Sequence, residues 1–273
     1  MAGSNRFSPS KGWDQTRLWL EQHRTYFVPI AGAFFMLPIL VVAFLGPDIV
    51  LPALDPETTD PDVWQAEVYA AIAPLVPWIL AMALVMCVGQ LAIVAIAVEE
   101  RGIGVGEAVK LGFVALGFYL LAQLLINIAA NIVSFAIGFV LLALGPLAFI
   151  LNLAFLVAFI WISMRLTLLA PALMGDGAKW PWPMIRRSWE LTAGNAGRIF
   201  LFYLLIGIVA FILLVVASLV LGLLGLMLGE TGVALSTVGL SAIAAAALTV
   251  YSLLPVAIWR QLAGSRATPQ VFS

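Results

Sequence analysis

Six apolar runs, each long enough to cross a bilayer as a helix, dominate the sequence. A membrane-spanning helix needs about 20 mainly apolar residues. Six segments meet this condition: 27–46, 68–98, 111–139, 147–173, 199–228 and 235–259. The composition agrees, because 63% of the residues are hydrophobic and only 10% are charged, whereas soluble domains are about 25% charged. The sequence therefore predicts an all-α fold, a polytopic membrane bundle of six transmembrane helices.

The second run, 68–98, is longer than the bilayer core requires. It contains Pro74 and Pro77, and proline inside a helix removes a hydrogen-bond donor and bends the chain. We expect this helix to tilt, to kink at one of the prolines or to project beyond the bilayer.

Acidic and basic residues are divided between different loops. The loop 47–67 carries six acidic residues and no basic one, whereas every basic residue except Arg165 lies in the N-terminal region, in 99–110, in 174–198 or in the tail. Because short cytoplasmic loops are enriched in Lys and Arg, we expect both termini to be cytoplasmic. The chain then divides into a cytoplasmic N-terminal segment with an amphipathic helix, a six-helix transmembrane domain and a cytoplasmic tail: 1–25, 26–262 and 263–273.

One pattern of segments occurs three times along the chain. Partly polar cytoplasmic segments at 13–24, 104–110 and 183–195 each precede two apolar runs. The first and third segments share Arg-x-Trp, at Arg17/Trp19 and Arg187/Trp189. The pattern predicts three hairpins, the middle one turning around Leu144-Gly145-Pro146, with short interfacial helices on the cytoplasmic side. The alternative is that short amphipathic connectors occur in polytopic proteins generally.

Arg165 is the one basic residue within an apolar run, about eight residues before its expected cytoplasmic end. Arginine near a helix centre costs about 2.5–3.5 kcal/mol on insertion scales, so we expect it to have a partner. The candidates are the carboxylates Glu99 and Glu100 and the amides Asn127 and Asn131. Arg165 would then either secure its helix to neighbours and headgroup phosphates or bind a ligand.

The third run carries Gln123, Asn127 and Asn131 at a spacing of four, which places them on one helical face. Such amides form hydrogen bonds between membrane helices. They also line cavities for polar headgroups or solutes. The sequence leaves both interpretations open.

The loop 174–198 combines arginines with tryptophans, which is typical of a cytoplasmic membrane interface. We expect lipid or protein contacts from six residues: Trp180, Trp182, Arg186, Arg187, Trp189 and Arg198. Anionic lipid fits these segments better than nucleic acid does, because they adjoin apolar runs and each contributes only a few charges.

No arrangement of residues has the spacing of a catalytic or metal site. The chain has one cysteine, Cys87, and one histidine, His23, and neither belongs to a nucleophile or ligand motif. We therefore expect no catalytic residue, no metal and no cofactor.

Two stretches form a recognisable pattern: Arg165-Leu-Thr-Leu-Leu-Ala-Pro171 and Arg187-Ser-Trp-Glu-Leu-Thr-Ala-Gly-Asn195. Together they resemble the signature of a group of six-helix bacterial membrane proteins. That group is related to the membrane domain of some glycerophosphodiester phosphodiesterases and includes the YciC-like proteins. The resemblance implies the fold and a bacterial inner membrane. The enzymatic barrel of those phosphodiesterases has no counterpart here, so the resemblance implies no such activity.

Three functions are compatible with these features of the sequence. The first is a non-enzymatic inner-membrane protein that engages lipids or a partner protein through its cytoplasmic Trp/Arg segments and polar interior. The second is a transporter or permease for a small polar or lipid-like solute. The repeats, Arg165 and the three amides of the third run favour this function. The third is a lipid-modifying enzyme, for which only Glu99 and Glu100 are candidate acids.

Overall fold

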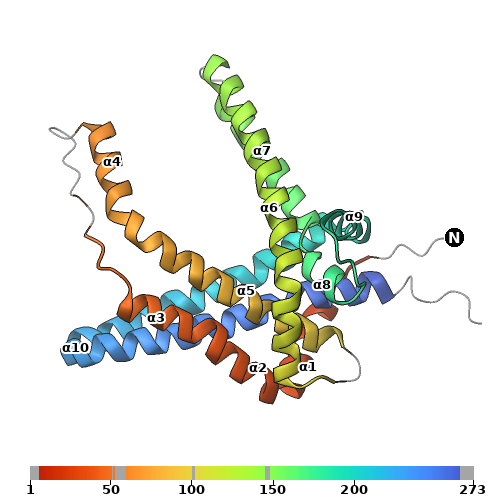
Figure 1. Ribbon diagram of the computed structural model, residues 1–273, viewed down its shortest axis with the longest axis horizontal. Helices are drawn as coiled ribbons and strands as arrows, with labels where there is room; N and C mark the ends of the chain where they lie inside the picture. Colours follow the sequence, from red (N-terminus) through yellow and green to blue (C-terminus); the bar gives the residue numbers. More distant parts are fainter. Residues whose placement is uncertain (1–5, 51, 53–59, 100–101, 145–147, 265–273) are drawn as a thin grey trace, which may run out of the picture.

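The computed structural model describes residues 6–50, 52, 60–99, 102–144 and 148–264, and every regular element in these ranges is helical (Figure 1). Five helical segments have the length and hydropathy needed to cross a membrane: Arg24–Leu45, Asp62–Val98, Val105–Phe139, Phe149–Met174 and Ala196–Gly264. The predicted all-α class, built from long apolar helices, is confirmed.

The first apolar segment is not a uniform α-helix. Helix α1 (Pro9–Gln22) leads into α2 (Arg24–Ala31), a π-helical turn η1 (Gly32–Met36) and α3 (Leu37–Leu45). Pro38 lacks the N–H that would bond the Phe34 carbonyl in a regular helix, which explains why the wider turn precedes it. This turn places Phe35 in the core, where its side chain is buried.

The second apolar segment bends where the prolines predict. Helix α4 (Pro61–Ile72) joins α5 (Val76–Val98) through a 3-10 turn, η2 (Ala73–Leu75), that contains Pro74. The predicted kink is confirmed at this turn. The C-terminal half of α5 is buried almost without interruption from Val88 to Ala97, which makes it the central helix of the core.

Helix α6 (Val105–Leu144) is continuous over 40 residues. The expected separate interfacial helix at 104–110 is wrong, because this segment forms the first turns of α6. Glu107 in the first turn suits a helix N-terminus, and no proline interrupts the helix between Val105 and Leu144. Helix α7 (Ala148–Arg165) lies beside the outer part of α6, and these two segments extend away from the other helices (Figure 1). The expected turn falls on 145–147, outside the described residues.

Two short helices, α8 (Leu169–Met174) and α9 (Pro181–Leu191), lead to α10 (Ala196–Gly264). Within α10, Gly229 has a φ of 62°, a left-handed conformation that glycine adopts readily. The arms on its two sides lie against each other, since a Cβ on Gly232 would be 2.9 Å from the Gly225 Cα. The chain therefore reverses direction at Gly229.

The buried core lies at one end of the helices. One apolar cluster surrounds the end of α5 and includes Leu91 and Met184, and a second contains Phe7, Leu191 and Leu254. The outer parts of α6, α7 and α10 instead expose large apolar side chains, such as Phe135 and Leu226. Surfaces of this kind match a hydrocarbon environment, so the chain is a membrane protein.

Candidate functional site

Arg165 is the last residue of α7, and α8 begins four residues later within the same apolar segment, Phe149–Met174. Its carbonyl oxygen accepts hydrogen bonds from Ser188 Oγ at 2.7 Å and Thr192 Oγ1 at 3.2 Å. Ser188 Oγ also accepts the backbone N–H of Leu168 at 3.1 Å. These buried hydroxyls of α9 and its C-terminal end replace the next helical hydrogen bond and hold the turn between α7 and α8.

The Arg165 side chain is enclosed by aromatic rings. Its guanidinium carbon lies 4.4 Å from the Trp189 ring centroid and 5.3 Å from that of Trp161. The two indoles meet edge to face at 5.4 Å, and only 7% of Arg165 is exposed. A desolvated cation on tryptophan gains about 2 kcal/mol or more. We call Trp161, Arg165 and Trp189 the Arg165 cluster.

The Arg165 guanidinium has neither a hydrogen bond nor an ion pair among the residues that the structure describes, and its Nε is buried. Glu99 does not pair with it, and Glu100 lies outside the described residues. The Asn127 and Asn131 amides bond within their own helix. The expected polar partner is thus replaced by two indole rings, and a buried cation is left without an anion.

The amides of Gln123, Asn127 and Asn131, which we call the amide row, form hydrogen bonds to other residues of α6. Gln123 Nε2 donates to Tyr119 Oη at 3.0 Å, whereas Asn127 Nδ2 and Asn131 Nδ2 each donate at 2.8 Å to the carbonyl four residues earlier. Asn127 and Asn131 are exposed. The structure therefore does not combine this row with Arg165, and these two amides do not line a space between described helices.

The six candidate interface residues fall into two groups. Trp180 and Trp182 are 66% and 73% exposed, and Arg186 forms an exposed pair with Glu190 at 2.8 Å. The other three hold elements together: Trp189 belongs to the Arg165 cluster, Arg187 pairs with Asp176, and Arg198 Nη1 donates to the Phe7 carbonyl at 3.4 Å.

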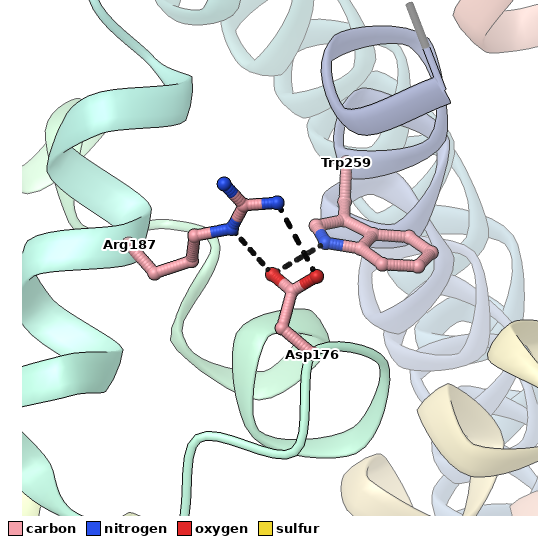
Figure 2. A network of polar contacts seen from close by, with 3 residues as sticks. All are labelled: Asp176, Arg187 and Trp259. Atoms are coloured by element: carbon pink, nitrogen blue, oxygen red, sulfur yellow. Dashed lines mark hydrogen bonds and ion pairs between the residues drawn. The ribbon is translucent and has the colours of Figure 1, made fainter. Parts of the chain in front are cut away.

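Asp176 joins α9 to the end of α10. Its Oδ2 accepts from Arg187 Nε at 2.8 Å and from Trp259 Nε1 at 3.2 Å, while its Oδ1 accepts from Arg187 Nη2 at 3.4 Å (Figure 2). Sequence reasoning did not select Asp176 or Trp259, because a lone carboxylate in a loop has no pattern that names its partner.

A second arginine–tryptophan pair was also missed. The Arg260 guanidinium lies 5.1 Å from the Trp19 ring centroid. Trp19 and Trp189 are the tryptophans of the two Arg-x-Trp repeats, and each lies beside an arginine at the end of another apolar helix. The repeat was the signal that could have paired Trp19 with such an arginine.

A groove of about 420 Å³ runs between α2, η1 and the second arm of α10. Its lining is apolar except for Thr249 and for Arg24 at the start of α2. From Arg24 to Met36 the groove follows about 18 Å of helix at 1.5 Å per residue. This exceeds the thickness of one leaflet, about half of a 30 Å hydrocarbon core. In the described part of the chain, Arg24 forms no ion pair.

Comparison with family models, curated proteins and solved structures finds no match to this chain. Within the described ranges, no three His, Cys, Asp or Glu side chains group in a way that could hold a metal ion.

Proposed function

We propose that this chain is a non-enzymatic protein of a bacterial inner membrane that binds anionic phospholipid at its cytoplasmic face. The proposal includes six spans in three hairpins, with both termini cytoplasmic. The reversal at Gly229 supports the sixth span, because it divides α10 into two arms that are each long enough to cross the bilayer.

The observation that carries the proposal is the guanidinium of the Arg165 cluster, which has a buried Nε and no hydrogen bond or ion pair among the described residues. A buried cation without an anion is unfavourable, and guanidinium N–H groups match the oxygens of a phosphate. The indoles of Trp161 and Trp189 belong to the aromatic class that collects at headgroup level. A lipid phosphate would supply the missing charge at the depth where these rings lie.

The Arg24 groove supports the same ligand class. Its length suits one acyl chain of the cytoplasmic leaflet, and Arg24 stands at the end where that lipid's phosphate would lie. The exposed Trp180, Trp182 and Arg186 would contact the surrounding headgroups.

Native mass spectrometry of the purified protein with phosphatidylglycerol and phosphatidylcholine tests the proposal. We expect retention of phosphatidylglycerol in preference to phosphatidylcholine. Arg165→Gln should lower that retention about tenfold, the effect of losing about 1.4 kcal/mol of a charge-assisted contact. Arg165→Lys should restore part of it, because it keeps the charge but loses the planar donor geometry.

Arg17→Gln is the matched control, since Arg17 is exposed and its one ion pair among the described residues is with Glu21 on its own helix. Its lipid retention should equal that of the parent. Thermal unfolding identifies any variant that fails to fold, and Arg24→Gln, at an exposed position, provides a second test. Equal retention of both lipids, or no loss in Arg165→Gln and Arg24→Gln, would overturn the proposal. Retention of a protein in place of lipid would do so as well.

A further inference from the structure

The amides of Asn127 and Asn131 are exposed in the middle of an apolar helix. From Leu111 to Leu144, helix α6 contains no charged residue. Asn127 is 16 residues from one end of this stretch and 17 from the other (127 − 111 and 144 − 127), or about 24–26 Å at 1.5 Å per residue. This uncharged stretch, about 50 Å long, exceeds the hydrocarbon core of about 30 Å, so its midpoint at Asn127 falls within the core.

Their hydrogen bonding is incomplete. A primary amide offers two N–H donors and a carbonyl acceptor. In the described structure each of the two amides makes one bond, from Nδ2 to its own helix at 2.8 Å. The second N–H and the Oδ1 of each have no partner within these residues. An unsatisfied polar group in hydrocarbon costs several kcal/mol, and a lipid tail cannot satisfy it.

The adjacent face of α6 permits close approach by another helix. Ala130, Ser134 and Gly138 recur at a spacing of four, the arrangement that lets membrane helices pack closely. A Cβ added at Gly138 would meet nothing within 4 Å. A shallow groove of about 850 Å³ lies on this face, lined by residues that include Asn131, Ser134 and Gly138.

We propose that this face of α6 binds a second copy of the same chain. An amide is both donor and acceptor, so it is complementary to itself. Across a twofold axis along the membrane normal, Asn127 faces Asn127 and Asn131 faces Asn131 of the other copy. The face carries no charge, so it does not match a charged partner. The outer part of α6, together with α7, extends away from the other helices (Figure 1), and Asn127 and Asn131 are exposed on α6.

Energy transfer between donor- and acceptor-labelled full-length chains in liposomes, over a range of protein-to-lipid ratios, measures this association. The parent should associate, and Asn127→Leu/Asn131→Leu should weaken the dissociation constant at least about tenfold, since interhelical amide contacts contribute up to about 1–2 kcal/mol each. Asn127→Gln/Asn131→Gln should recover part of the affinity. Thr237→Val is the control, because Thr237 is half-buried on α10, away from the proposed interface, and among the described residues its hydroxyl bonds only the Val233 carbonyl of its own helix.

Cross-linking locates the interface. With Cys87→Ser removing the chain's one thiol, Ser134→Cys should form a disulfide-linked dimer on oxidation in native membranes. Leu219→Cys, exposed on α10, should not. The proposal fails if the parent is monomeric at every ratio, if the Leu variant associates as tightly as the parent, or if Ser134→Cys links only to a different protein.

Discussion

The guanidinium of Arg260 lies over the indole of Trp19, 5.1 Å from the ring centroid, although the two residues stand near opposite ends of the chain. The same guanidinium donates from Nη2 to the Ala97 carbonyl at 2.7 Å. A cation at the C-terminal carbonyls of a helix is favoured by the helix dipole. Arg260 thus joins α1, α5 and α10 at the end of the molecule where the core lies.

Arg260→Gln should destabilise the protein by about 1.5–3 kcal/mol, the typical contribution of a hydrogen bond from a charged group. Thermal unfolding in mild detergent measures the loss. Arg186→Gln is the control, because Arg186 is exposed and, in the part of the chain that the structure describes, its ion pair is with Glu190 of the same helix. Equal melting temperatures for the two variants would show that the Arg260 contact adds no stability.

Removing both hydroxyls that hold the Arg165 carbonyl should destabilise the turn after α7. Ser188→Ala/Thr192→Val leaves that buried carbonyl and the Leu168 N–H without their side-chain partners, at a cost of about 1–3 kcal/mol for each unsatisfied group. Denaturant unfolding followed by circular dichroism gives the change. Ser163→Ala removes a half-buried hydroxyl whose partner among the described residues is the Phe159 carbonyl of its own helix, and it should leave the midpoint unchanged.

Gly89→Ala should separate η1 from α5. A Cβ at Gly89 would lie 2.5 Å from the Phe34 Cβ, closer than packed atoms allow, and overpacking of this kind costs about 1–3 kcal/mol. The melting temperature should fall. In Gly117→Ala the added methyl meets nothing within 4 Å, and the gain in helix propensity should leave stability equal or higher. A stable Gly89→Ala variant would contradict the close contact.

Asp176 and Arg187 should be energetically coupled. In a double-mutant cycle with Asp176→Asn and Arg187→Gln, we expect a coupling energy of about 0.5–2 kcal/mol, because the pair is bidentate and partly buried. Chemical denaturation of the four proteins supplies the cycle. Additive effects would mean that the contact in Figure 2 contributes no net stability.

Phe7→Ala should show that the N-terminal segment is part of the core. Phe7 is 1% exposed, packs edge to face on Phe202, and its N–H donates to Asn195 Oδ1 at 2.9 Å. Truncating a buried phenylalanine costs about 3–5 kcal/mol. Unfolding in detergent should show this loss, whereas Phe149→Ala, at an exposed position, should change stability little. A small effect of Phe7→Ala would place the segment outside the cooperative fold.

The sequence by itself determined the all-α class, the long apolar helices and two candidate positions for a bend in the second run, Pro74 and Pro77, of which the structure uses Pro74. These depend on runs of neighbouring residues and on the missing N–H of proline, both of which can be read along the chain. The tertiary structure decided that α7 ends at Arg165, that 104–110 belongs to α6, and that indole rings surround the buried arginine. Such outcomes depend on which distant side chains approach one another. Ser188 bonds the Arg165 carbonyl at the end of α7, and Trp189 covers the Arg165 guanidinium. Both contacts form because α9 folds back against the end of α7. The hydropathy pattern along the chain does not predict that contact.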